Sequence, residues 1–216
     1  MATSVYVDGF NLFRGCLKGS GFKWLNLEQL CDRLFPNDQI TRIRYFTAMV
    51  LPFPHNADAP TNQLVYLRAL ATLPRVTIHR DGWFASHPVV WPEYPLSYPN
   101  GPSQPPKRTR VLKLEEKRTD VEIATHLLVD CFDNEFDHAV VISNDSDLAA
   151  PVAVVRDKFG KRVTTVNPHK RWKVSRDLVR ASSDYVATIN KSVLRRCQFP
   201  DTLSDTVGTF RKPPTW

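Results

Sequence analysis

The stretch Ala139-Val140-Val141-Ile142-Ser143-Asn144-Asp145-Ser146-Asp147 decides the fold class of this chain. Its first four residues are apolar and mostly β-branched, which predicts a short strand buried on both faces, as in a parallel sheet. A polar run with two acids follows, and an apolar helical pattern then begins at Leu148. Acids at the carboxyl end of such a strand indicate a ligand site, because open α/β sheets bind ligands at that edge.

Two other segments also place an acid where a strand ends or a helix begins. Val5-Tyr6-Val7-Asp8-Gly9-Phe10-Asn11 ends a strand at Asp8, and Glu116-Lys117-Arg118-Thr119-Asp120-Val121 brings Asp120 to the start of a helix. In βαβ units a helix starts at the edge where the preceding strand ends. We therefore expect the carboxylates of four residues to gather at the carboxyl edge of the sheet: Asp8, Asp120, Asp145 and Asp147.

Strand and helix patterns alternate along the chain, which predicts an α/β fold with a parallel sheet covered by helices on both faces. Strands are expected at residues 4–7, 41–48, 76–80, 111–114, 139–142 and 162–166. The helix over 119–132 is expected to turn Val121, Ala124, Leu128 and Phe132 inward. If the strands at residues 4–7 and 139–142 are neighbours in the sheet, the acids lie at a topological switch point.

The chain is expected to form one domain over residues 1–197, with residues 198–216 as a C-terminal extension packed on it. Residues 86–106 hold seven prolines together with Trp91, Tyr94 and Tyr98. This composition predicts a long loop that covers the edge of the site rather than a core element. A Pro-rich peptide ligand for another domain is the alternative.

Composition favours a polyanionic partner. The 216 residues carry a net charge of +7, and Lys and Arg cluster around residues 107–118 and 156–180. Such clusters beside acids fit nucleic acid, whereas solvated helix faces are the alternative interpretation. No apolar run reaches the roughly 20 residues of a membrane span and no signal peptide is evident. Four cysteines without metal spacing predict reduced core thiols in a cytoplasmic protein.

Oxygen ligands of this kind suit Mg²⁺ or Mn²⁺, and they predict metal-dependent phosphodiester cleavage with all four acids as ligands. Each acid also has a simpler interpretation: a turn at Asp8, a favourable helix-dipole position at Asp120, and an N-cap at Asp145 or Asp147, more readily at Asp147. The expected supporting residues are Asn11, Ser143 and Asn144. Among them, Ser143 is expected to bond a carboxylate or a phosphate.

The three acidic segments resemble the signature segments of NYN-domain proteins, which belong to the PIN-like nuclease superfamily. The likeness extends through Gln198-Phe199-Pro200 and the closing Arg211-Lys212-Pro213-Pro214-Thr215-Trp216 toward a bacterial NYN branch. The resemblance implies a three-layer α/β/α sandwich with strand order 3-2-1-4-5, and Mg²⁺- or Mn²⁺-dependent ribonuclease activity. We expect an endoribonuclease, although the sequence leaves exonuclease action open. Arg118-Thr119 and His126 depart from the family pattern.

The partner expected from these arguments is RNA or another single-stranded nucleic acid, and the chain is compatible with a homodimer. The residues expected to contact nucleic acid are Lys117, Arg118, Lys170, Arg171 and Lys173. Two alternatives stay open. One is a non-catalytic RNA-binding or adaptor module, and the other is a small-molecule phosphatase or oxidoreductase on the same scaffold.

Overall fold

The computed structural model describes residues 1–52, 56–92, 108–170 and 173–216. The strands are β1 (Ala2–Asp8), β2 (Gln39–Ala48), β3 (Val76–Pro92), β4 (Arg108–Lys117), β5 (His138–Ile142), β6 (Arg162–Val166), β7 (Asp184–Val186), β8 (Thr202–Asp205) and β9 (Gly208–Arg211). The helical segments are α1 (Gly9–Leu12), η1 (Phe13–Leu17), α2 (Leu27–Leu34), α3 (Ala59–Leu70), α4 (Thr119–Phe132), η2 (Ser146–Leu148), α5 (Ala149–Asp157), α6 (Arg176–Ala181) and α7 (Lys191–Arg196).

One seven-stranded sheet runs through the molecule in the order β4-β3-β2-β1-β5-β6-β7. All neighbouring pairs are parallel except β3 with β4. The predicted order 3-2-1-4-5 corresponds to β3-β2-β1-β5-β6 and is confirmed. Sequence reasoning missed β7 at one end and the true length of β4 at the other. Strands β1 and β5 are neighbours, so the sheet has its switch point between them.

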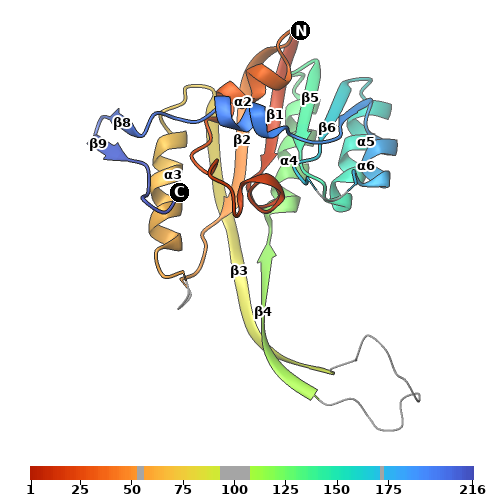
Figure 1. Cartoon of the computed structure of the whole chain (residues 1–216). Helices are drawn as coiled ribbons and strands as arrows, with labels where there is room; N and C mark the ends of the chain where they lie inside the picture. The colour runs from red at the N-terminus through yellow and green to blue at the C-terminus, as the bar shows by residue number, and fades with distance from the viewer. Residues whose placement is uncertain (53–55, 93–107, 171–172) are drawn as a thin grey trace.

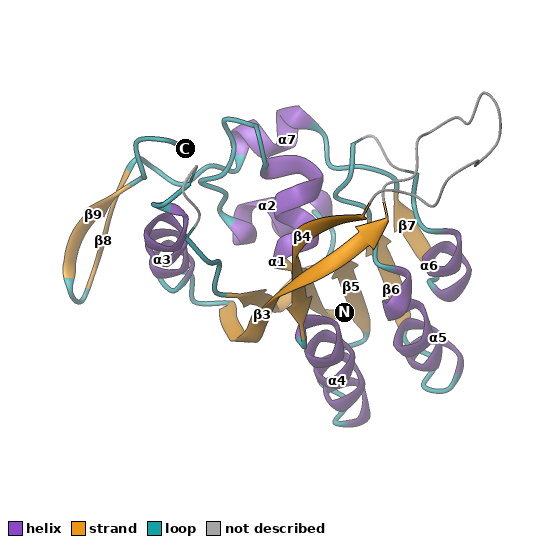
Figure 2. Ribbon diagram, turned by 90° about the horizontal axis from the view of Figure 1, so that it is seen from below, coloured by secondary structure: helices purple, strands orange, loops and turns teal. Residues whose placement is uncertain are grey.

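Helices cover both faces of the sheet, which gives the predicted three layers (Figure 1, Figure 2). On β1, Val5 and Val7 pack into a core shared with α2, α3 and α7, while Tyr6 packs into a second core with α4, α5 and α6. This division follows from the strand period of two, because successive side chains point to opposite faces. No described helix is both long and apolar enough to span a bilayer.

The inward face of α4 differs from the prediction. Ile123, Leu127 and Cys131 are buried, whereas Val121 is 67% exposed and Phe132 is 77% exposed. The buried face also carries Asp130, whose carboxylate accepts bonds of 2.7 and 2.8 Å from Arg44 and one of 2.8 Å from the Tyr6 hydroxyl. Leu128, also predicted inward, is partly buried against the second core, so that part of the prediction is confirmed. A charged residue lies on the core side, which is why apolar periodicity alone placed Val121 and Phe132 inward in error.

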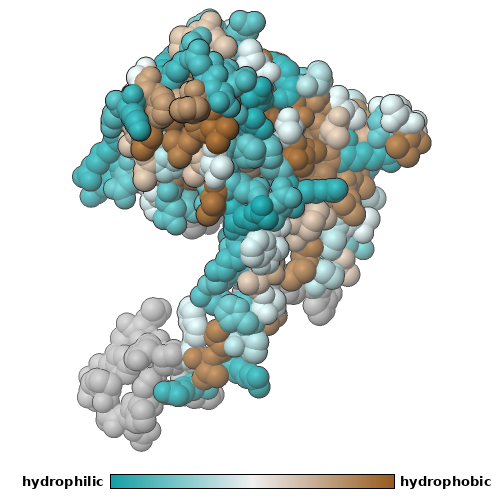
Figure 3. All heavy atoms as spheres, turned by 180° about the vertical axis from the view of Figure 1, so that it is seen from behind, coloured by the Kyte–Doolittle hydropathy of each residue, from teal (hydrophilic) through white to brown (hydrophobic). Residues whose placement is uncertain are grey.

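The prediction of a loop over residues 86–106 is wrong for residues 86–92, because β3 continues to Pro92 and pairs antiparallel with β4. The two strands form an arm that leads away from the body instead of covering the site (Figure 1). Seen from behind, the arm projects from the body, and hydrophobic side chains gather near the end of its described part (Figure 3). Proline is tolerated there because past Gly82 the described part of β3 pairs only with β4. Residues 93–106 of the predicted loop, which include Tyr94 and Tyr98, lie outside the described residues.

The chain after α7 packs against the N-terminal half of the protein. Phe199 and Phe210 are buried in the core that contains Trp24, and the indole Nε1 of Trp24 donates a 2.9 Å hydrogen bond to the carbonyl of Pro200. The four cysteines are free and buried, as expected for reduced core residues.

Candidate active site

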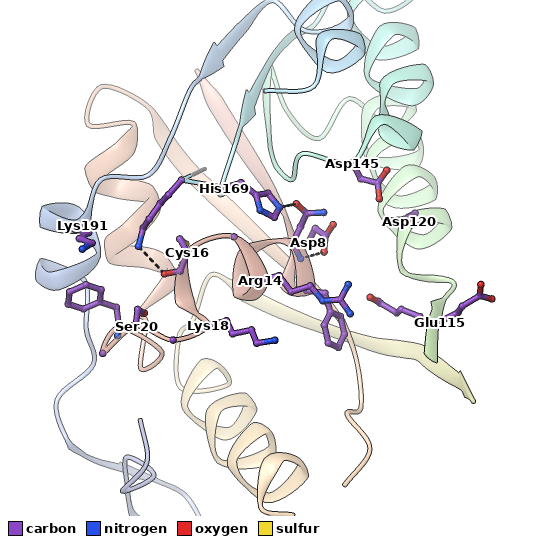
Figure 4. Close-up of a pocket in the computed structure, with 18 of the residues that line it drawn as sticks. Asp8, Arg14, Cys16, Lys18, Ser20, Glu115, Asp120, Asp145, His169 and Lys191 are labelled. Carbon is purple, nitrogen blue, oxygen red and sulfur yellow. Dashed lines mark hydrogen bonds between the residues drawn. The ribbon is translucent and has the colours of Figure 1, made fainter. Parts of the chain in front are cut away.

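Three of the predicted acids line one pocket at the carboxyl edge of the sheet. Asp8 ends β1, Asp120 lies in the first turn of α4, and Asp145 follows β5. The pocket has a volume of about 1320 Å³. Figure 4 shows Asp8 between the helix that carries Arg14 and the side of the pocket that holds Asp120 and Asp145. The cations that line it are Arg14, Lys18, Lys117, Lys170 and Lys191.

Asp8 is the most enclosed acid of this group, with 4% of its surface exposed. The Ser143 hydroxyl donates a 2.9 Å hydrogen bond to Oδ2, and the Asn11 backbone N–H donates a 2.8 Å bond to Oδ1. Burial raises the pKa of Asp8, and the charge of Asp145 raises it further, while the bonds from Asn11 and Ser143 oppose the shift. The expectation that Ser143 bonds a carboxylate is confirmed.

Asp145 caps the short helix η2. Its Oδ1 accepts a 3.1 Å hydrogen bond from the backbone N–H of Asp147, and its own N–H donates to the Ser143 hydroxyl at 3.1 Å. The sequence left the cap open between Asp145 and Asp147, and the structure places it at Asp145. Asp147 is exposed and does not line the pocket.

The carboxylates influence one another electrostatically. Burial raises the pKa of Asp120 to about 6, and the negative charges of Asp8, Asp145 and Asp147 add to the effect. The predicted acids are therefore close enough to repel one another when ionised, Asp147 included.

Glu116 is a further acid at this site that sequence reasoning did not select. Burial raises its pKa to about 7, with contributions from the charges of Asp8 and Asp120, and the Thr119 hydroxyl and Arg14 oppose the rise. The Thr119 hydroxyl donates a short hydrogen bond to Glu116 Oε1. Glu116 belongs to β4, which was expected to end at Leu114. Its position in the acidic segment 116–121 was the available signal.

This donor set fits a hard divalent cation that keeps part of its water. No three His, Cys, Asp or Glu side chains in the described ranges are arranged as a ready ligand cluster. Mg²⁺ commonly binds through one or two carboxylates and retains several waters, so it does not require three direct protein ligands. Repulsion among Asp8, Asp120 and Asp145 is relieved when a cation enters. The donors of Asp8, Asp120 and Asp145 are carboxylate oxygens, which suit Mg²⁺ or Mn²⁺ rather than Zn²⁺.

Asn11 and Asn144 connect the loops around the site. Asn11 Oδ1 accepts a 3.1 Å hydrogen bond from the Asn144 N–H and lies 2.8 Å from His169 Nε2. Asn144 in turn accepts a 2.7 Å bond from the Ser175 N–H and donates a 3.2 Å bond to the carbonyl of Lys173. Both supporting residues therefore fix the chain around β1, β5 and the segment after β6. His169 was not predicted.

Only some of the residues predicted to contact nucleic acid line the pocket. Lys117 and Lys170 line the pocket, with Lys117 Nζ 2.8 Å from Glu115 and Lys170 Nζ donating a 3.4 Å bond to the carbonyl of Cys16. Arg118 forms an ion pair of 2.8 Å with Glu122 outside the pocket.

Lys173 is exposed and does not line the pocket, and Arg171 lies outside the described residues. The cations Arg14, Lys18 and Lys191 were missed because each stands apart from the two basic clusters in the sequence. His126, where the sequence departs from the family pattern, lies 4.3 Å from His79 and 5.5 Å from Phe46, ring centre to ring centre, and does not line the pocket.

Residues 101–190 match the NYN domain. This match confirms the resemblance to NYN-domain proteins of the PIN-like superfamily. The matched range contains Asp120, Asp145 and Asp147, whereas Asp8 lies before it.

Two further comparisons cover nearly the whole chain. The chain is 28% identical over 239 aligned positions to 6-hydroxy-3-succinoylpyridine 3-monooxygenase HspA of Pseudomonas putida (strain DSM 28022 / S16), covering all of this chain and 75% of that protein. The structure is also similar to a crystal structure of a protein of unknown function from Vibrio parahaemolyticus RIMD 2210633, with a TM-score of 0.52 and 14% identity over 88% of this chain and 93% of that one. The second likeness supports the fold alone.

Proposed function

We propose that this protein is a metal-dependent ribonuclease that hydrolyses phosphodiester bonds at the carboxyl edge of its sheet. The observation that carries the proposal is that Asp8, Asp120 and Asp145 line one pocket together with four lysines and one arginine. Acids that gather a divalent cation beside side chains that attract phosphate form the usual composition of a phosphoryl-transfer site.

The residues of the chain have distinct roles in this proposal. Asp8, Asp120 and Asp145 would hold Mg²⁺ or Mn²⁺. Asp147, which does not line the pocket, adds negative charge that acts on Asp120. An ion held there would supply positive charge beside the scissile phosphate and would lower the pKa of a water that attacks it. Ser143 and the Asn11 N–H keep the Asp8 carboxylate in one orientation. Arg14, Lys18 and Lys170 attract the flanking phosphates.

RNA as the substrate rests on charge and on the family. The net charge of +7 and the cations around the pocket favour a polyanion over a small neutral molecule. The NYN match favours RNA over DNA. The acids favour catalysis over the alternative of a non-catalytic RNA adaptor, since such a module does not require several buried or half-buried carboxylates beside its phosphate-binding side chains.

A second candidate function is oxidation of a small heteroaromatic molecule. The match that favours it spans the whole chain and is to a protein named as a monooxygenase of a substituted pyridine. Monooxygenation places one atom of O₂ in the substrate and reduces the other to water with two electrons from a donor. The two candidates therefore differ in every reactant.

One experiment separates the candidates. The protein is incubated with labelled single-stranded RNA or DNA in Mn²⁺, Mg²⁺ or EDTA, and oxygen uptake is followed in parallel with a reduced nicotinamide and a pyridine carboxylate. The proposal predicts RNA cleavage that EDTA abolishes, without substrate-dependent oxygen uptake. Oxygen uptake without cleavage would establish the second candidate, and RNA binding without either reaction would establish the adaptor.

A further inference from the structure

A second pocket lies beside the carboxylate pocket. It has a volume of about 420 Å³, within the range of about 300–1,000 Å³ that is typical of small-ligand sites. Phe10, Arg14 and Lys18, which are spaced four residues apart, line both pockets and so form the ridge between them. The aromatic side chains that line the second pocket are Phe10, Phe13, Tyr45, Tyr66, Phe84 and Trp216.

The aromatic walls are held in place by contacts among themselves. Phe10 and Phe84 meet edge to face with ring centres 5.2 Å apart, and Tyr66 lies 5.6 Å from Trp216 and 6.3 Å from Tyr45. The Tyr66 hydroxyl donates a 2.9 Å hydrogen bond to the carbonyl of Leu25. These contacts make the pocket pre-formed, so little conformational freedom is lost when a flat ring enters.

The polar groups of the pocket select the substituents of that ring. Three basic residues line the pocket: Arg14, Lys18 and Lys23. Among the described lining residues they are opposed by one acid, Asp58, so the pocket favours a ring with an anionic substituent. Lys23 Nζ lies 5.8 Å from the centre of the Trp216 ring, which places a cation beside an aromatic wall. Asn62 makes a long bond of 3.4 Å to Thr215 and retains hydrogen-bonding capacity toward a ring heteroatom.

We infer that this pocket binds one planar heteroaromatic ring with an anionic group attached. Two sources supply such a ligand: an unpaired base of a nucleic acid with its phosphate, and a free heteroaromatic acid. The first source rests on the proposed ribonuclease function. It places a base in the pocket while the adjoining phosphate lies across the Arg14–Lys18 ridge toward Asp8. The second source does not depend on that function.

The test measures ring binding in EDTA, so that it is independent of cleavage. Uridine 5′-monophosphate, adenosine 5′-monophosphate and nicotinate are titrated separately, with saturation-transfer NMR on the ligand as the readout. Asn62→Trp fills the pocket from α3, and Thr61→Trp adds the same side chain at the neighbouring exposed position, which does not line it. Wild type and Thr61→Trp should bind alike, and Asn62→Trp should bind at least tenfold more weakly.

A second filling variant, Leu51→Trp, enters from the loop after β2 and guards against a local defect in α3. Competition then identifies the source. Displacement of nicotinate by single-stranded RNA, but not by the same ribose-phosphate chain without bases, assigns the pocket to a nucleobase. Nicotinate binding that RNA does not displace assigns it to a free heteroaromatic acid.

No binding of any ring probe at millimolar concentration would overturn the inference, and so would equal binding by wild type and both filling variants. If the ring probes bind as expected and no RNA cleavage occurs with Mn²⁺ or Mg²⁺, the proposed ribonuclease function is wrong. The inference that this pocket binds a heteroaromatic ring is then still supported.

Discussion

The Ser143 hydroxyl donates a 2.9 Å hydrogen bond to Asp8 Oδ2, so the loop after β5 holds the carboxylate that ends β1. The same hydroxyl accepts a 3.1 Å bond from the N–H of Asp145. One side chain therefore positions two of the three acids that line the pocket. This relationship joins the two neighbouring strands at the switch point of the sheet.

Ser143→Ala should lower the free energy of unfolding by about 1–2 kcal/mol, because it removes the hydroxyl that donates to the buried Asp8 Oδ2 and accepts from the Asp145 N–H, while the bond from the Asn11 N–H to Asp8 Oδ1 remains. It should also lower the rate of RNA cleavage while Asp8 remains in place. Urea unfolding and single-turnover cleavage measure the two effects. Ser143→Thr keeps the hydroxyl and is the control. Equal stability and equal rate in Ser143→Ala and wild type would refute this positioning role.

Glu116→Gln should change the pH dependence of stability. The pKa of Glu116 is about 7 in the folded protein against an ordinary value of 4.5, so its contribution to stability is present below pH 4.5 and is lost as the pH rises to about 7. The variant should equal wild type at pH 4 and exceed it by about 1 kcal/mol at pH 8, after allowance for solvent screening.

This comparison is made by urea unfolding in EDTA at both pH values. Histidines whose pKa is lowered by burial, such as His79, contribute in the opposite direction in both proteins and cancel in the difference. A variant that is less stable than wild type at pH 8 would contradict the assignment of Glu116 to the crowded acids.

Gly9 follows Asp8 directly and has no room for a side chain. A Cβ there would lie 2.7 Å from the carbonyl oxygen of Phe46 and 2.7 Å from the Tyr45 ring. Gly9→Ala should therefore lower the free energy of unfolding by about 1–3 kcal/mol. Gly21→Ala is the matched control, because a Cβ at Gly21 meets nothing within 4 Å. Thermal unfolding compares the two variants. Equal melting temperatures for Gly9→Ala and Gly21→Ala would disprove the close approach of Phe46 and Tyr45 to Gly9.

The fold was largely predictable because buried parallel strands are short apolar runs with clear boundaries. The gathering of Asp8, Asp120 and Asp145 at one edge follows from that pattern. The strand order was implied by the resemblance to NYN-domain proteins and not by the apolar runs. The arm was not predictable from composition, since Pro88 and Pro92 argue against a strand unless only one edge of that strand is paired.

Parts of the site depend on contacts between distant segments and leave no local signal. Glu116 reaches the pocket only because β4 extends past Leu114 beside β3. The orientation of α4 depends on the pairing of Asp130 with Arg44, which lies 86 residues away in the chain. The choice of Asp145 rather than Asp147 as the cap depends on backbone angles that spacing alone does not fix.

Binding of single-stranded RNA should weaken with salt. With about four to six phosphate contacts, log K should fall against log salt with a slope of roughly −3 to −4. Lys170→Gln removes a pocket cation and should reduce the magnitude of the slope by about 0.7, uniformly across RNA sequences. Lys158→Gln, at the end of α5 and outside the pocket, should leave the slope unchanged. Identical slopes in all three proteins would argue against phosphate binding along this pocket.

The most direct test of the metal-dependent ribonuclease is the single-turnover cleavage rate of labelled RNA in Mn²⁺. We expect Asp8→Asn and Asp145→Asn to lose at least about a hundredfold in rate, because several kcal/mol of transition-state stabilisation depend on the bound ion. Asp133→Asn, at the far end of α4 from Asp120, should cleave at the wild-type rate, and all variants should stay folded in EDTA. Wild-type cleavage by Asp8→Asn or Asp145→Asn, or undiminished cleavage by wild type in EDTA, would contradict the account.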